Sequence, residues 1–191
     1  MKEGINLSMN EQLMFSLDLN KCINCKNCEM ACNDHYNLHG IHRREVLTYE
    51  KKSSGAAVHI SMSCNHCRNP VCMLVCPENN FQKRQDGIVV LNATNCKSCT
   101  RCVEACPFHA IKINPYTNRV DKCNFCVERI VQGKEPICVS NCVTGALKMV
   151  KIHKQDVKSY PLNKDIPIAK YTKPSIYMTE KQTVKTYLRG G

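Results

Sequence analysis

The chain has 191 residues and a formal net charge of +11, and 16 of its residues are cysteine. The hydrophobic share of 43% includes those cysteines, Trp is absent, and Phe occurs only four times. Without the cysteines, the apolar share is thin for a packed core in a chain of this size. We therefore expect something other than aliphatic packing to hold the centre together.

The composition and the first residues also bear on where the chain works. Residues 1–20 contain no apolar signal segment and no twin arginine, and no run of 18 apolar residues occurs in the chain. We expect no direct membrane span and assembly in a reducing cytoplasm, where thiols bind metal instead of forming disulfides. The positive net charge suggests that the chain binds nucleic acid. No nucleic-acid-binding motif supports that interpretation, so we expect no nucleic-acid partner.

The cysteines fall into four groups that share one spacing rule. Each group begins with C-x-x-C and ends with C-x-x-x-C, and only the gap between these two parts varies. The groups are Cys22, Cys25, Cys28 and Cys32; Cys64, Cys67, Cys72 and Cys76; Cys96, Cys99, Cys102 and Cys106; and Cys123, Cys126, Cys138 and Cys142.

This spacing is typical of cubane iron–sulfur sites. Three thiolates on a tight loop can wrap one face of a cluster, while a fourth, about one helical turn later, points elsewhere. In bacterial ferredoxins that fourth cysteine, usually followed by proline, ligates the other cluster of a pair. Pro77 and Pro107 stand in that position, whereas Asn33 and Val143 replace it in the first and last groups.

Sixteen cysteines at four per cluster predict four [4Fe–4S] clusters. The alternative from another class is a zinc-bearing binding module, because two C-x-x-C pairs can hold zinc. Zinc does not explain a triplet plus an outlier repeated four times. Spacing alone leaves open whether neighbouring groups pair in sequence or in a nested order. Each oxidised cluster with four thiolates carries about −2, so four clusters would reduce the charge to about +3.

The order of motifs resembles a known family. The matching stretches are FSLDLNKCINCKNCEMAC, CNHCRNPVCMLVCP, DGIVVLN, CKSCTRCVEACPFHAI, RVDKC and GKEPICVSNC, and the match runs from Phe15 to Val150. They resemble the four-cluster iron–sulfur subunits of the dimethyl sulfoxide reductase family of molybdopterin oxidoreductases. The resemblance implies a nested pairing in which each triplet receives its fourth ligand from another group. The implied sets are Cys22, Cys25, Cys28 with Cys142; Cys123, Cys126, Cys138 with Cys32; Cys64, Cys67, Cys72 with Cys106; and Cys96, Cys99, Cys102 with Cys76.

The expected fold class is α+β, with two pseudo-symmetric bacterial 2[4Fe–4S] ferredoxin-like units in residues 1–150. The outer pair of clusters would come from 22–32 and 123–142, and the inner pair from 64–76 and 96–106. Short helices are expected to begin near the fourth cysteines. Residues 151–191, basic and without cysteine, predict an extended C-terminal arm that orders against a larger subunit. Strands are predicted at Ala57–Met62, Gly87–Leu91, Ala110–Ile113 and Ala146–Val150.

The resemblance implies a non-catalytic subunit that passes single electrons between a molybdenum or tungsten pterin catalytic subunit and a second partner. That partner would be a quinone-reactive membrane subunit or a soluble carrier, in a complex of anaerobic respiration. The alternative is an electron-transfer subunit of a hydrogenase or formate–hydrogen-lyase complex. Family members often leave the cytoplasm folded, carried by a signal on the catalytic partner. The final location is therefore expected to be either the cytoplasm or the far side of the membrane, with membrane association through a partner.

Three other side chains stand out in the cysteine loops. His66 is expected to form a hydrogen bond or pack, because four cysteines already serve each cluster. Lys97 and Arg101 could raise the potential of a nearby cluster, since positive charge favours its reduced form. The alternative for these two is a pair of solvated surface charges.

Overall fold

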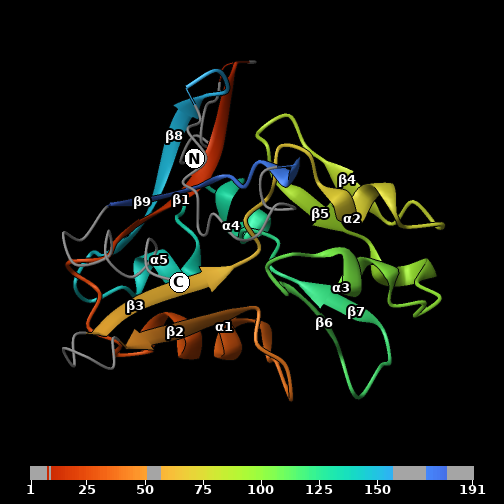
Figure 1. Ribbon diagram of the computed structural model, residues 1–191, viewed down its shortest axis with the longest axis horizontal. Coiled ribbons are helices and arrows are strands. Elements are labelled where there is room, and N and C mark those ends of the chain that lie inside the picture. The colour runs from red at the N-terminus through yellow and green to blue at the C-terminus, as the bar shows by residue number, and fades with distance from the viewer. Residues whose placement is uncertain (1–7, 9, 51–56, 157–170, 180–191) are drawn as a thin grey trace.

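The computed structural model describes residues 8, 10–50, 57–156 and 171–179. Its elements form a mixed α and β structure with one three-stranded and three two-stranded sheets (Figure 1). The elements in chain order are β1 (Glu11–Asp18), α1 (Asn27–Tyr36), β2 (Arg44–Glu50), β3 (Ala57–Ser63), α2 (Val71–Leu74), β4 (Phe81–Lys83), β5 (Val89–Leu91), a 3-10 turn (Ala93–Asn95), α3 (Arg101–Ala105), β6 (Ile111–Ile113), β7 (Val120–Lys122), α4 (Val127–Ile130), α5 (Ile137–Ser140), β8 (Leu147–His153) and β9 (Ile176–Thr179).

The three-stranded sheet joins segments from both ends of the sequence. Strand β1 lies in the middle, with β8 antiparallel on one side and β9 parallel on the other. Phe15 of β1 is opposite Met149 of β8 and Ile176 of β9. Because alternate side chains of a strand face the same side, Leu13, Phe15 and Leu17 point together into the core and are fully buried.

Two halves follow from this topology (Figure 1). The outer half combines the three-stranded sheet with α1, α5 and the β2–β3 hairpin, and helix α1 contacts both α5 and β2. The inner half comes from the middle of the chain and contains the β4–β5 and β6–β7 hairpins with α2 and α3. Its buried core is small: Phe81, Val89, Cys102, Ile111 and Val120.

The predicted strands exist, with shifted ends. The strand predicted at Gly87–Leu91 begins at Val89, because Gly87 occupies the preceding turn, and the last predicted strand continues to His153. The prediction that short helices begin near the fourth cysteines is wrong. Helix α1 contains both Cys28 and Cys32, while α2, α3 and α5 contain the third cysteine of their group and end before the fourth. One turn of helix spans the C-x-x-x-C step, so the helix must begin before it.

The predicted C-terminal arm lies partly outside the described residues, which exclude 157–170 and 180–191. Its described part contacts this chain itself. Residues 151–153 complete β8, and β9 pairs with β1. Thr172, Ser175 and Met178 are buried, so residues 171–179 contribute to the core of the chain.

A glycine turn fixes the inner half against β1. Gly87 has φ of +81°, and a Cβ atom at this position would lie 2.9 Å from Gln12 Cβ. The adjacent Asp86 carbonyl accepts a hydrogen bond from the Leu13 amide at 2.9 Å. Gly87→Ala should therefore destabilise the protein by about 2–4 kcal/mol, combining the left-handed backbone cost with overpacking.

The matched control for this substitution is Gly145, which has φ of +62° and open space where a Cβ atom would lie. Gly145→Ala should cost only about 1–2 kcal/mol, since the backbone term alone applies. Thermal unfolding midpoints measured without oxygen would compare the two variants. Equal shifts of the unfolding midpoint would show that the contact with Gln12 adds nothing to the cost of Gly87→Ala.

An ion pair also joins the two halves. Arg43 Nε and Nη2 donate to the two carboxylate oxygens of Asp121 in β7 at 2.6 and 2.9 Å, and the guanidinium lies 4.3 Å from the Tyr36 ring centroid. Both side chains are largely buried. Arg43→Met should lower stability by about 2 kcal/mol, because it leaves a desolvated carboxylate without its partner.

The double variant Arg43→Met with Asp121→Asn should recover part of that loss, since it removes the unpaired charge. A thermal unfolding midpoint no lower in Arg43→Met than in the unsubstituted protein would contradict this role for the pair.

Candidate metal centres

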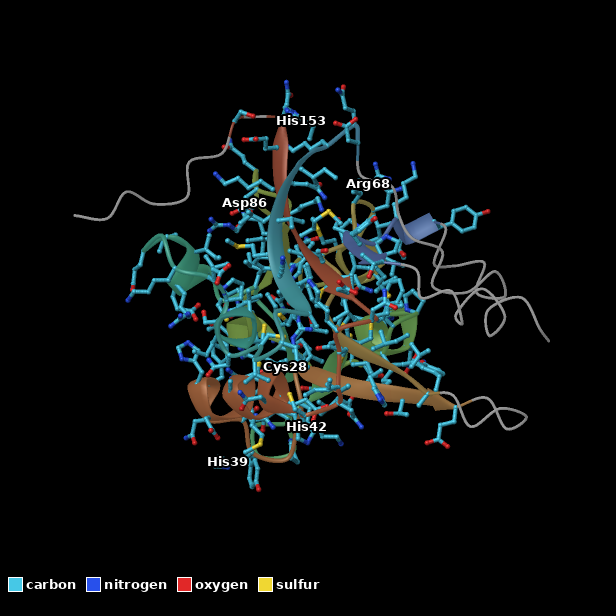
Figure 2. All side chains as sticks on the ribbon, turned by 90° about the vertical axis from the view of Figure 1, so that its left-hand side faces the viewer. Cys28, His39, His42, Arg68, Asp86 and His153 are labelled. Atoms are coloured by element: carbon cyan, nitrogen blue, oxygen red, sulfur yellow. The ribbon has the colours of Figure 1, made fainter. Side chains whose placement is uncertain are left out.

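The first cysteine group meets the last cysteine of the chain. A small cavity is lined by Cys22, Cys25, Cys28 and Cys142, with Leu17, Val46 and Leu147 among its apolar walls. Cys142 reaches it because it follows α5, which packs on α1. Cys28 lies within the body of the protein, whereas His153 lies at the far tip of β8 (Figure 2).

Two further cavities lie in the inner half. One is lined by Cys64, Cys67, Cys72 and Cys106. The other is lined by Cys76, Cys96, Cys99 and Cys102. In each case three thiols come from one group and the fourth comes from the other. These are the groupings that the resemblance implies for the inner pair.

The remaining four thiols also lie together in the outer half. Cys32 is buried, as are Cys123, Cys126 and Cys138. Burial raises the pKa of Cys32, and the charges of Cys123, Cys138 and Cys126 raise it further. Twelve of the sixteen predicted residues therefore line three shared cavities, and the other four are buried cysteines of the outer half.

Each C-x-x-C loop has the same backbone turn. The residue directly before the second cysteine has a positive φ in all four groups: Asn24, His66, Ser98 and Phe125. A left-handed residue there turns its amide back toward the first cysteine of the loop. The amides of Ser98 and Phe125 donate to the sulfurs of Cys96 and Cys123, both at 3.4 Å.

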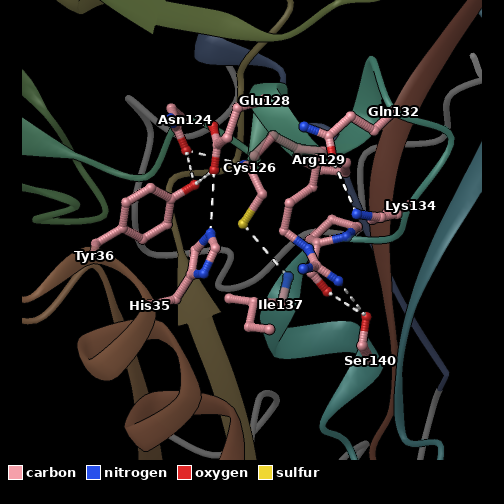
Figure 3. Close-up of polar contacts among 12 residues, drawn as sticks. His35, Tyr36, Asn124, Cys126, Glu128, Arg129, Gln132, Lys134, Ile137 and Ser140 are labelled. Carbon is pink, nitrogen blue, oxygen red and sulfur yellow. Dashed lines mark hydrogen bonds and ion pairs between the residues drawn. The ribbon is translucent and has the colours of Figure 1, made fainter.

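Other amides approach the sulfurs from outside the loops. The Leu147 amide donates to Cys142 Sγ at 3.2 Å, and the Ile137 amide donates to Cys126 Sγ at 3.4 Å (Figure 3). On the other side of Cys126, the Tyr36 hydroxyl donates to Asn124 Oδ1 at 2.9 Å and to the Glu128 carboxylate. This network ties the end of α1 to the fourth cysteine group. Amide donors of this kind stabilise charge on cluster sulfurs and tune the potential.

Burial makes free thiolates unfavourable in these cavities. It raises the pKa of the Cys67, Cys72 and Cys138 thiols to about 12 and that of Cys102 to about 11. Thiolate ligands here therefore need a compensating positive charge, which an iron–sulfur core supplies.

The residues present fit a cubane better than a single ion. Among the described residues, no three His, Cys, Asp or Glu side chains come close enough together to hold one metal ion. The thiols instead surround a space. Asn65, in the loop between Cys64 and Cys67, lines the cavity of its group, and its buried amide nitrogen has no hydrogen-bond partner among the residues that the structure describes. A bound cluster would offer that donor a sulfur acceptor.

Two buried cations and one partly buried cation near the sites were missed by sequence reasoning. The Lys83 ammonium donates to the Cys67 carbonyl at 2.6 Å, and the Lys122 ammonium donates to the Cys123 carbonyl at 2.8 Å. Arg44 is fully buried at the start of β2. The only sequence signal was the position of Lys122 directly before Cys123. By contrast, Lys97 and Arg101 are exposed, as the solvated-charge alternative expects.

His66 has the structural role expected for it. Its Nδ1 accepts a hydrogen bond from the Val89 amide at 3.0 Å, and its ring contacts Phe125 edge-on with centroids 5.3 Å apart. Burial lowers the pKa of His66, with help from the Lys122 and Lys83 charges, so the ring is neutral.

These sites define a ferredoxin-type electron carrier with four [4Fe–4S] clusters. Residues 55–152 and 21–80 each match a family described as 4Fe-4S dicluster domain. This protein belongs to the iron–sulfur electron-transfer subunits of the molybdopterin oxidoreductases.

Three relatives illustrate the family. The sequence is 35% identical over 181 residues to a component of the anaerobic dimethyl sulfoxide reductase of Escherichia coli (strain K12), and the match covers 88% of each protein. It is 34% identical to the thiosulfate reductase electron transfer subunit PhsB of Salmonella typhi, over 83% of this sequence and 85% of that one. A component of the tetrathionate reductase of Salmonella typhimurium is 41% identical, over 68% of this sequence and 54% of its own.

Proposed function

We propose that this chain conducts single electrons between a molybdenum or tungsten pterin catalytic subunit and a second partner. The second partner is a quinone-reactive membrane subunit or a soluble carrier. The similarity to subunits of dimethyl sulfoxide, thiosulfate and tetrathionate reductases supports a catalytic partner of that kind. The observation that carries the proposal is the division of the thiols into separate sets that run through both halves.

The ligand sets are part of this proposal. The outer clusters would be held by Cys22, Cys25, Cys28 with Cys142 and by Cys123, Cys126, Cys138 with Cys32. The inner clusters would be held by Cys64, Cys67, Cys72 with Cys106 and by Cys96, Cys99, Cys102 with Cys76. The shared cavity linings and the effect of the fourth group on the pKa of Cys32 support the assignment. When bound, these clusters accept and release one electron at a time.

The protein residues perform three tasks in that function. The cysteines fix the cluster positions, the loop amides donate to sulfur, and the apolar walls keep water away. Within the described residues, no helix is long and apolar enough to cross a bilayer.

In this proposal, partner subunits determine the cellular location of the protein. Membrane association would come through a partner subunit. The complex would be assembled in the cytoplasm and either remain there or be exported folded with a signal-bearing subunit. The part of residues 151–191 that lies outside the described residues is proposed to contact the catalytic partner.

The test is elemental analysis of the native complex purified without oxygen. Iron, molybdenum, tungsten, nickel and zinc would be counted per copy of this chain. About sixteen or more iron atoms together with molybdenum or tungsten are expected from four clusters and a pterin partner. Iron with nickel would instead assign the protein to a hydrogenase complex. Zinc with little iron would overturn the proposal of an electron carrier.

A further inference from the structure

A positive charge is buried between the two outer cysteine sets. Arg44 is 2% exposed, and within the described part of the chain no carboxylate forms an ion pair with it. A desolvated guanidinium without a counter-charge is very unfavourable. The surroundings of Arg44 must therefore supply negative charge in some other form.

Neutral groups hold this guanidinium in one position. Its nitrogens donate to the Ser61 carbonyl at 3.2 Å and to the hydroxyls of Ser61 and Ser63, both at 2.9 Å. Its carbon lies 4.4 Å from the ring centroid of Phe15. Strands β1 and β3 thus fix the charge from two sides, and the hydrogen bonds satisfy its donors without neutralising it.

Cysteines of both outer sets surround this charge, and as cluster-bound thiolates they would supply the negative charge. Burial lowers the pKa of Arg44, but the charges of Cys138, Cys123, Cys28 and Cys32 raise it above its usual value. Cys28 belongs to one proposed set, and the other three belong to the second. The geometry agrees with both neighbours. Ser61 links the guanidinium to Cys28, and Phe15, which the guanidinium contacts, packs on Phe125 between Cys123 and Cys126 with ring centroids 4.2 Å apart. One guanidinium therefore lies beside both proposed sets.

Ser61 connects this charge directly to one of them. Its hydroxyl oxygen lies 2.9 Å from an Arg44 nitrogen and 3.3 Å from Cys28 Sγ. A guanidinium can only donate, so the oxygen accepts from Arg44 and its hydroxyl proton is available to Cys28. Ser61 also lines the cavity of that cysteine set.

We infer that Arg44 sets the reduction potentials of the two outer clusters together. The inference rests on the proposed ligand sets. One electron that enters a cluster changes its net charge from about −2 to about −3. Arg44 keeps its proton throughout, so its fixed charge favours the reduced form of both clusters. Burial makes this attraction far stronger than that of an exposed charge.

The experiment compares substitutions of Arg44 in the native complex by redox titration followed by electron paramagnetic resonance. In Arg44→Met, two of the four clusters should become harder to reduce. At a fixed potential, their ratio of reduced to oxidised form should fall about tenfold or more, which corresponds to about 59 mV for a one-electron couple. The two inner clusters should shift much less. Arg44→Lys, which keeps the charge, should retain most of both outer potentials.

The matched control is Lys21→Gln, which removes an exposed charge directly before Cys22. Its effect should stay below about twofold, since solvent and salt screen it. If Arg44→Met fails to load clusters, Arg44→Gln decides, because its amide can still donate to Ser61 and Ser63 but carries no charge, so both outer potentials should fall.

Unchanged potentials in an Arg44→Met complex with all four clusters would overturn the inference. They would leave the proposed function intact, provided that the unsubstituted complex still contains the expected iron and molybdenum or tungsten. If Arg44→Met does not load, an unchanged set of potentials in Arg44→Gln would overturn the inference as well.

Discussion

Cys142→Ser should remove or convert the same cluster as Cys22→Ser, and Cys138→Ser should affect a different one. Cys138 and Cys142 lie four positions apart around the end of α5. They nevertheless belong to different proposed sets, because Cys142 lines the cavity of the first group. Loss of a thiolate should cost a whole cluster, about four iron atoms, or leave a three-iron cluster.

The measurement combines an iron count per polypeptide with electron paramagnetic resonance of each variant. Cys32→Ser is the matched partner of Cys138→Ser, and the two should remove one common signal. If Cys138→Ser and Cys142→Ser removed the same signal, the fourth group would act as a self-contained site and nested pairing would be wrong. Loss of a signal shared between Cys32→Ser and Cys64→Ser would instead support sequential pairing.

Removal of the clusters should unfold the inner half of the chain. Its five buried core residues include one cysteine, and its strands form two hairpins of three-residue strands. Isolated hairpins of this kind are marginally stable at best. Structural metal sites contribute about 10–16 kcal/mol in small zinc domains, which is comparable with the total stability of many domains, about 5–15 kcal/mol.

Amide hydrogen exchange after anaerobic oxidation and chelation of iron would test this expectation. The amides of Val89, Ile111 and Val120 should lose their protection. Amides between β1 and β8 serve as the internal control, because that sheet has a larger apolar core around Leu13, Phe15 and Leu17. An iron-free protein with native protection in the inner half would contradict a cluster-dependent core.

Cysteine spacing predicted much of the candidate site. It indicated the four groups, the cubane type of site and the exchange of the fourth ligand, because those features depend on local geometry. It could not choose between nested and sequential pairing, which depends on the contact between α1 and α5. That choice came from the resemblance. Local sequence patterns also could not predict the sheet β8-β1-β9, since it joins strands that are far apart in sequence.

The positions of the charged side chains near the cysteine sets could not be predicted from local sequence either. Arg43 and Arg44 are neighbours in sequence, yet Arg43 pairs with Asp121 and Arg44 lies buried between thiols. Strand pairing decides which of the two arginines points inward. Arg44 lies opposite Ser63, and the residues that follow it in β2 pair with the rest of β3. Sequence reasoning selected Lys97 and Arg101 because they stand within a cysteine loop, and both are exposed.

The central position of β1 sets an order of events during synthesis. This strand leaves the ribosome early, but its partners β8 and β9 are made later, after every cysteine group. The inner half, by contrast, has all its hairpins once β7 has emerged. The middle of the chain can therefore become complete first. The outer half closes last, when β8 pairs with β1 and the last cysteine reaches the first group.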